Sequence, residues 1–529
     1  PDTATVRPTF LHLLPEALAV ASWVGGPRAL LTANALLAGF SLLAVFAFGA
    51  RLVRPVWSLV AMTALAVSLP QLHFSRDTFS EIPAQLLLFA GLTLLYDVTR
   101  RRERLRSPLL PGLVAGLVLG ASCIARIDAF FYLVPLTVFL TVLAVAGAAR
   151  LAAGVAGGVL VAAALGYVDL RAASPRYLEL QAANLHLIWA ALAAVVLAAV
   201  ATLVWRDRAL ALWERLPRPA LGTAAGGLIV VLGLFAYFAR PHLQTAHNIP
   251  DGQPTAVEAL QQAEGFAVQP GRSYDELSLH WLGWYLGPVA LALGILGFAL
   301  LVRRALRTRD GSLPGLAFLL VFGASSLLYL WKPSIIPVQY WATRRYLPAT
   351  LPGLLLCAAW LPNISGSWRR LRPPVGVVVA VALLAAPLWF LRGHATDREY
   401  VPMLDATARI CAALQPDDAV VILGRPPMST GMPQTIGAFC HVPVAVVSDP
   451  TTNRELATAY RAAHAAGRRL VYLSPTPSTS LPDGPVAGSF RQLVDTTVSV
   501  EALSLLHRPD GRFTFPFTVW FAAAPPPAA

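Results

Sequence analysis

Residues 56–98 read VWSLVAMTALAVSLPQLHFSRDTFSEIPAQLLLFAGLTLLYDV, two long apolar runs joined by a short polar segment. Each run approaches the 20 residues or so that a helix needs to cross about 30 Å of hydrocarbon. The polar segment, HFSRDTFSE (73–81), carries the charged side chains that separate the runs. The stretch therefore predicts two membrane-spanning helices with a polar connection at one membrane surface.

The same pattern covers most of the chain, which has 529 residues, of which 56% are hydrophobic and 13% charged. Soluble domains average about 25% charged residues, and the mean hydropathy here is +0.60. The composition predicts an α-helical polytopic membrane protein. We expect twelve spans, near 28–50, 56–73, 80–98, 109–126, 129–148, 151–169, 184–205, 220–239, 281–302, 313–331, 345–361 and 374–391.

The net charge of +13 comes almost wholly from arginine, because Lys332 is the only lysine. The arginines lie in short segments between apolar runs, which favours contact with anionic lipid and excludes a basic groove for nucleic acid. They concentrate in alternate connections: Arg51 and Arg54; Arg100, Arg101, Arg102, Arg104 and Arg106; Arg150; Arg206, Arg208, Arg215 and Arg218; Arg303, Arg304, Arg307 and Arg309; and Arg369, Arg370 and Arg372. By the positive-inside rule these connections are cytoplasmic.

This orientation predicts a multi-pass protein of a cell membrane, inner or plasma, with residues 392–529 outside the cytoplasm. Residue 1 would also lie outside, so we expect an earlier helix and a first outer loop to precede it. Residues 1–391 form the expected transmembrane domain, and residues 392–529 the soluble extracytoplasmic domain.

The soluble domain reads as α/β. Strands are predicted at 419–424, 442–449 and 468–475, with helices at DATARICAAL (405–414) and RELATAYRAAHAAG (454–467). No GxGxxG follows the first strand, so nucleotide binding has no support. If the domain is extracytoplasmic, Cys411 and Cys440 could form a disulfide.

Ionisable residues at the ends of spans are the candidates for function, because charge is costly in lipid. In the segment 73–81, Asp77 and Glu81 are four residues apart and could share a proton or a divalent cation such as Mg²⁺ or Mn²⁺ on one helix face. Arg76 beside them could neutralise them or bind an anion. The alternative is a polar loop with a helix cap.

Two further clusters are expected at the same surface. Arg126 and Asp128 lie between two spans with almost no room for a loop, either as a structural ion pair or as binding residues. His280 and Trp281 open the span at 281–302 and could bind sugar. Trp281, Trp284 and Tyr285 at helical spacing are typical of an interfacial aromatic belt, which is the simpler explanation.

The fourth cluster is WKPSIIPVQYWATRRYLP (331–348), which places Lys332, Arg344 and Arg345 on the outer side, against the charge trend. Trp341 and Tyr346 flank the arginine pair. Guanidinium groups match phosphate oxygens in a bidentate way, which favours phosphate recognition. Anchoring to lipid headgroups is the alternative.

Three segments resemble the GT-C superfamily of membrane glycosyltransferases: RPTFLHLLPEALA (7–19), SRDTFSE (75–81) and QYWATRRYLPATLPGLLL (339–356). The likeness is strongest to actinobacterial cell-envelope members akin to protein O-mannosyltransferases and aminoarabinose transferases, and it covers about residues 7–391. It implies a polyprenyl-phosphate sugar donor, a glycan, lipid or protein acceptor, and a groove for the polyprenyl chain in the bilayer.

By the same resemblance, Asp77 and Glu81 match an acidic position that holds a metal or orients the substrates, and Arg344 and Arg345 match the basic position at the donor phosphate. The key aspartate of such enzymes lies in the first outer loop, which we expect to precede residue 1. The oligosaccharyltransferase signature WWDYG is absent, which argues against that branch.

Two other classes of function remain open. A transporter or flippase for an anionic lipid would also need outer arginines and acids at helix ends, but it should carry ionisable groups at mid-span depth, where this chain has almost none. A non-catalytic scaffold with an outer binding domain is the third possibility.

Overall fold

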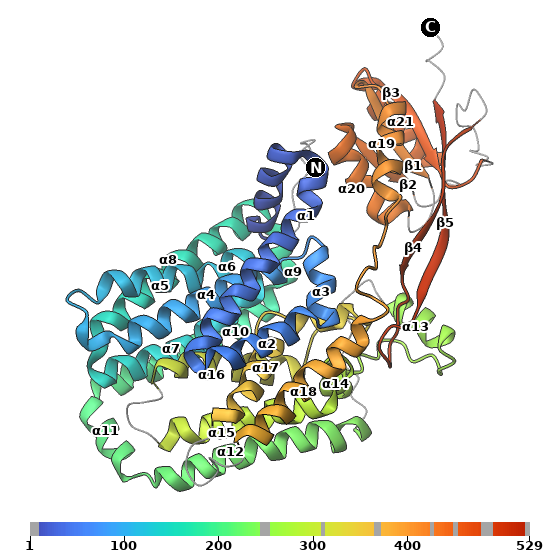
Figure 1. Cartoon of the computed structure of the whole chain (residues 1–529). Coiled ribbons are helices and arrows are strands. Elements are labelled where there is room, and N and C mark those ends of the chain that lie inside the picture. The colour runs from blue at the N-terminus through green and yellow to red at the C-terminus, as the bar shows by residue number, and fades with distance from the viewer. Residues whose placement is uncertain are drawn as a thin grey trace. The chain divides into compact units, whose positions relative to one another are not determined.

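The structure is a computed structural model that describes residues 10–243, 254–307, 313–363, 372–423, 428–447, 453–477 and 490–523. The chain divides into two compact units. The membrane unit comprises Val6–Ala395 and Leu503–Arg508, and the C-terminal unit comprises Pro1–Thr5, Thr396–Ala502 and Pro509–Ala529. The α-helical polytopic fold with a C-terminal α/β domain is confirmed (Figure 1).

The described residues of the membrane unit are mainly helical. Its α-helices are α1 (Leu13–Leu52), α2 (Pro55–Ala66), α3 (Leu69–Arg76), α4 (Glu81–Arg100), α5 (Leu109–Gly120), α6 (Ser122–Ala125), α7 (Leu133–Leu143), α8 (Ala149–Ala173), α9 (Pro175–Leu180), α10 (Ala182–Val204), α11 (Arg206–Arg215), α12 (Arg218–Leu234), α13 (Pro254–Ala263), α14 (Ser278–Leu286), α15 (Pro288–Arg307), α16 (Leu313–Trp331), α17 (Thr350–Trp360) and α18 (Arg372–Leu391). Short helical turns include η2 (Ile127–Tyr132), η3 (Ala144–Ala148), η4 (Phe235–Ala239) and η7 (Trp341–Arg345). Every expected span therefore corresponds to helix.

By length and composition, eight helices of the described residues could cross a membrane, or up to nine if the bent pair α2–α3 is one span. One of the eight is a continuous stretch of 47 residues, Ile127–Ala173. At 1.5 Å per residue this would be about 70 Å long, roughly twice the hydrocarbon thickness. It is interrupted at Gly147, whose φ of +87° is a glycine conformation, so the stretch holds the two spans expected at 129–148 and 151–169.

Helices α2 and α3 meet at an angle of 64°. Pro70 lies in the first turn of α3, where a proline is tolerated, and it has no N–H to continue the hydrogen bonds of α2. The bend makes α3 a separate short helix, which contains the first four residues of the polar segment 73–81.

Small residues permit close contact between α5 and α8 (Figure 1). A Cβ added at Gly116 would collide with the carbonyl oxygen of Val155, and one added at Gly158 with that of Leu113. Such small-residue contacts are usual between membrane helices, where backbones approach without a large hydrophobic driving force.

Burial differs sharply among the helices. All eleven residues of α17 are buried, whereas Leu185 is the one buried residue of α10.

At the end of the unit opposite the segment 73–81, Arg51 at the end of α1 pairs with Asp97 near the end of α4 at 2.7 Å. Two of the arginine-rich connections therefore lie at the same end of the helices.

The C-terminal unit contains a five-stranded sheet in the order β2-β1-β3-β5-β4. Strands β1 (Asp418–Leu423), β2 (Val444–Val447) and β3 (Arg469–Ser474) are parallel, and β4 (Arg491–Glu501) and β5 (Arg512–Ala523) form an antiparallel pair. Its helices are α19 (Met403–Ala413), α20 (Met428–Cys440) and α21 (Asn453–Ala465). The three expected strands are present; Gly424 and residues 448–449 lie outside the described residues.

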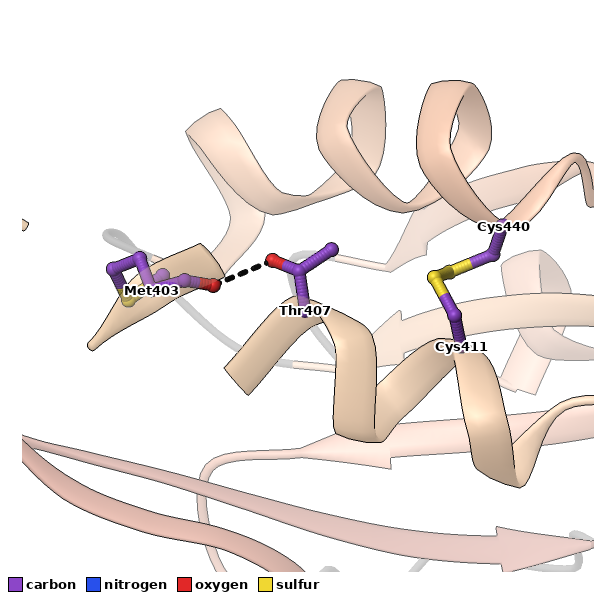
Figure 2. Close-up of a disulfide and its surroundings, with 4 residues drawn as sticks. All are labelled: Met403, Thr407, Cys411 and Cys440. Carbon is purple, nitrogen blue, oxygen red and sulfur yellow. Dashed lines mark hydrogen bonds between the residues drawn. A yellow bond between two sulfur atoms is a disulfide. The ribbon is translucent and has the colours of Figure 1, made fainter. Parts of the chain in front are cut away.

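Helices α19 and α20 are joined by the disulfide Cys411–Cys440 (Figure 2). Thr407, one turn before Cys411, donates a hydrogen bond to the Met403 carbonyl at 2.8 Å inside α19. The other two cysteines, Cys123 and Cys357, are free and buried. The pairing considered from the sequence is therefore confirmed.

Candidate functional site

The segment 73–81 does not form one helical face. Helix α3 ends at Arg76, Asp77 is extended (φ −100°, ψ 165°), and α4 begins at Glu81. The side chain of Asp77 is 43% exposed, whereas Glu81 is fully buried. The expectation that the two carboxylates share a helix face is therefore corrected, because the chain turns between them.

Glu81 instead joins two distant arginines. Arg126 Nη1 forms an ion pair with Glu81 Oε1, and Arg344 Nε donates a hydrogen bond to the same oxygen. Arg126 also holds Asp128 in a bidentate way, with Nε–Oδ1 at 2.8 Å and Nη2–Oδ2 at 2.6 Å. Three of the segments singled out in the sequence thus meet at Glu81.

Asp128 extends the cluster to the second arginine of the pair. Arg345 Nη1 lies 3.3 Å from Asp128 Oδ2, and the Tyr329 hydroxyl donates to the same oxygen at 3.0 Å. Arg345 Nη2 also donates to the Ser334 carbonyl at 3.2 Å. We refer to Glu81, Arg126, Asp128, Arg344 and Arg345 as the arginine–carboxylate cluster.

Two aromatic rings hold the guanidinium of Arg344. Its Cζ lies 4.3 Å from the ring centroid of Trp341 and 4.9 Å from that of Phe79. Burial lowers the pKa of Arg344 below its ordinary value, although Glu81 raises it. An arginine pKa starts so high that the guanidinium stays charged at neutral pH.

The charges of the cluster do not balance. Three arginines face two carboxylates, which leaves one positive charge in a largely buried place. Arg345 Nε and Glu81 Oε2 have no hydrogen-bond partner among the described residues. An uncompensated buried charge is costly, so the cluster is suited to receive one anionic group that accepts hydrogen bonds.

A divalent cation does not fit at Glu81. Its Oε1 already faces two guanidinium groups, and the excess positive charge would repel a metal ion. Within the membrane unit, Asp77 and His73 could hold a metal, with Oδ2 and Nε2 at 3.4 Å. His73 was not selected from the sequence. Its position four residues before Asp77 was the signal that could have identified it.

The remaining expected residues lie outside the cluster. Arg76 donates to the carbonyl groups of His394 and Ala395, and Lys332 is exposed just after α16.

His280 stacks on Tyr237 with ring centroids 4.3 Å apart, and burial lowers the pKa of His280. Trp281 is fully buried, so it is not part of an aromatic belt at the lipid surface.

Two tyrosines support the cluster. Tyr346, an expected substrate-binding residue, is fully buried, and its hydroxyl donates to the Tyr329 carbonyl at 3.2 Å. Tyr329, which no sequence argument selected, holds Asp128. Its place near the end of an apolar span gave no signal, because aromatic residues are common there.

No family model matches the chain, and no curated protein does. The chain does resemble solved structures of the oligosaccharyltransferase AglB from the archaeon Archaeoglobus fulgidus. The structure described as a complex with Zn and sulfate has a TM-score of 0.51 and 13% identity, covering 88% of this chain and 59% of that one. The apo form gives 0.52 and 12%, covering 88% and 62%.

A third structure of that protein, in complex with an inhibitory peptide and a dolichol-phosphate, has a TM-score of 0.51 and 13% identity, covering 88% of this chain and 61% of that one. The chain thus spans about six-tenths of the length of these proteins. Identity this low shows a shared fold. It confirms the GT-C-like architecture of a membrane protein.

Proposed function

We propose that this protein is a membrane glycosyltransferase that moves a sugar from a polyprenyl phosphate to a hydroxyl of a glycan, lipid or protein acceptor outside the cytoplasm. The observation that carries the proposal is the buried arginine–carboxylate cluster with its excess positive charge, in a GT-C-like fold. Support for the lipid donor also comes from AglB, which was solved with a dolichol-phosphate.

The excess charge of the cluster matches a single phosphate. A sugar joined to a polyprenyl monophosphate is a phosphodiester with one negative charge. When the acceptor oxygen bonds to the anomeric carbon, the bond from that carbon to the phosphate oxygen breaks, and the electron pair leaves with the phosphate. Arg344 and Arg345 would stabilise this growing charge more in the transition state than in the ground state.

Glu81 and Asp128 serve this site by orienting the arginines. Each carboxylate contacts Arg126 and one arginine of the pair. Because guanidinium groups with fixed directions need no reorganisation during the reaction, this arrangement favours catalysis. Glu81 is therefore a positioning residue, and its expected role in metal binding is dropped.

Asp77 is assigned to the acceptor side. It is partly exposed and lies in the turn that leads to Glu81. A carboxylate there can take the proton that the acceptor hydroxyl loses, and His73 at 3.4 Å can share it. A metal ion, if one is used, would be held by this pair and would lower the pKa of the hydroxyl.

Two observations support the proposed side of the membrane. Two of the arginine-rich connections lie at the end opposite the cluster, where Arg51 meets Asp97. The disulfide Cys411–Cys440 requires an oxidising compartment to persist. Both support the proposal that the C-terminal unit lies outside the cytoplasm.

The test uses farnesyl phosphate, a short polyprenyl monophosphate, with farnesol as the uncharged control. Purified protein in lipid nanodiscs should bind farnesyl phosphate at least tenfold more tightly than farnesol. The double variant Arg344→Gln/Arg345→Gln should weaken binding by about 10- to 100-fold, the range for charge-assisted hydrogen bonds. Arg171→Gln, at an exposed arginine of α8, is the matched control.

Equal affinity for farnesyl phosphate and farnesol would refute the phosphate site. Transfer is then measured with polyprenyl-phosphate sugars and membrane extract as the acceptor source. Tight phosphate binding without transfer of any sugar would instead favour a lipid transporter. Repeating the binding titration in EDTA should leave the affinity unchanged, because Glu81 holds no metal.

A further inference from the structure

The connection between β4 and β5 enters the membrane unit. Leu503–Arg508 belong to that unit although β4 and β5 belong to the other. Leu505 is fully buried in the hydrophobic core of the membrane unit, and Ser504 is buried beside it. Leu503, two residues earlier, is 59% exposed. The segment therefore buries Ser504 and Leu505 in the membrane unit, whereas Leu503 stays exposed.

Three polar or aromatic contacts hold the segment Leu503–Arg508 in place. The Gln339 amide donates to the Ser504 carbonyl at 2.8 Å, in an isolated antiparallel bridge. The Leu505 amide donates to Glu264 Oε1 at 2.8 Å. The Arg508 guanidinium lies 3.8 Å from the ring centroid of Phe390. The three partners lie in different parts of the membrane unit: Gln339 just before η7, Glu264 just after α13, and Phe390 in α18.

Gln339 is the link to the arginine–carboxylate cluster. It lies two residues before η7, the short turn that carries Arg344 and Arg345. Its side-chain Oε1 accepts a hydrogen bond from the Tyr285 hydroxyl at 2.9 Å. The next residue, Tyr340, accepts from the Thr343 amide at 2.8 Å. A 3₁₀ turn has weak internal hydrogen bonds, so its geometry depends on such anchors.

We infer that Leu503–Arg508 is a positioning segment of the donor site, which holds the backbone at Gln339 and so fixes the direction of Arg344 and Arg345. The expected effect on farnesyl phosphate binding rests on the proposed function. The support of the backbone at Gln339 does not depend on that function. Glu81 and Asp128 orient the guanidinium groups of Arg344 and Arg345, but they do not hold the backbone of the turn that carries them. The β4–β5 connection supplies part of that backbone support through its hydrogen bond with Gln339.

The test compares Leu505→Ala with Leu503→Ala, which removes the same atoms from an exposed position. In full-length protein, Leu505→Ala should speed hydrogen exchange of the amides of 339–346 by about tenfold or more. Amides of α5 and α8 should exchange at the wild-type rate, which shows that the fold is intact. Leu503→Ala should leave both regions unchanged.

Farnesyl phosphate binding supplies the second readout. Leu505→Ala should weaken it by roughly tenfold in the wild-type background and by less than twofold in the Arg344→Gln/Arg345→Gln background, because the segment acts through the arginines. Unchanged exchange at 339–346, or an equal loss of affinity in both backgrounds, would overturn the inference. If wild-type protein binds no farnesyl phosphate, the proposed function fails, and the exchange comparison still decides whether the segment holds Gln339.

Discussion

At the scale of single residues, Glu81 is a buried acid held between two positive charges. It begins a membrane-spanning helix, is fully buried, and contacts two guanidinium groups through one oxygen. In the sequence, Glu81 is an acid before an apolar run, which is typical of an ordinary helix start as well as of a functional site. The structure distinguishes it, because Arg126 and Arg344 contact it from remote parts of the chain.

Replacing Glu81 tests whether the carboxylate holds the arginines. Glu81→Gln keeps the shape of the side chain but leaves Arg126 and Arg344 without their shared anion. Breaking a buried ion pair typically costs about 3–5 kcal/mol. We expect a clear fall in the apparent melting temperature of the purified protein, measured by intrinsic tryptophan fluorescence. Glu16→Gln, at an exposed acid of α1, should melt like the wild type.

The sequence selected every member of the cluster, because charged residues at span ends stand out against apolar surroundings. It assigned them to separate groups, since Glu81, Arg126 and Arg344 are far apart in the chain and their meeting depends on helix packing. It also predicted that Asp77 and Glu81 share one helix face, which is wrong because α3 ends at Arg76 and α4 begins at Glu81. Tyr329 could not be found, since the acid that it holds is not adjacent in sequence.

At the scale of elements, the expected spans correspond to helices because a long apolar run in lipid has few other ways to satisfy its backbone. The connections were harder to foresee. The bend between α2 and α3 and the division of α14 from α15 subdivide runs that look continuous in hydropathy. Strands β4 and β5 were missed because the 10-residue connection between them is not a tight turn with a sequence signature.

The disulfide between α19 and α20 closes a loop with a sequence separation of 29. In the chain-entropy model such a cross-link stabilises the folded state by roughly 3–4 kcal/mol. Cys411→Ser/Cys440→Ser should therefore unfold at a markedly lower temperature than the wild type. Adding a reductant should lower the melting temperature of the wild type toward that of the variant. A wild type that melts identically with and without reductant would contradict this expectation.

At the scale of the whole molecule, the distribution of arginine predicts the orientation in the membrane. We expect the C-terminal unit outside the cytoplasm. A cysteine introduced at the exposed Gly467 should react with a membrane-impermeant maleimide in intact cells, and one introduced at the exposed Arg101 only after lysis. The free native cysteines, Cys123 and Cys357, are buried and provide a low background. The reverse labelling pattern would invert the topology and move the donor site to the cytoplasm.

The contrast between α10 and α17 bears on how this protein can change over generations. Along α10, where Leu185 is the one buried residue, substitutions among Leu, Ile, Val and Phe alter no packing, and selection acts only against polarity. In α17, where all eleven residues are buried, a single added or removed methylene must be matched by a neighbour. Lineages of this protein should therefore diverge quickly in the first helix and slowly in the second, although both are almost equally apolar.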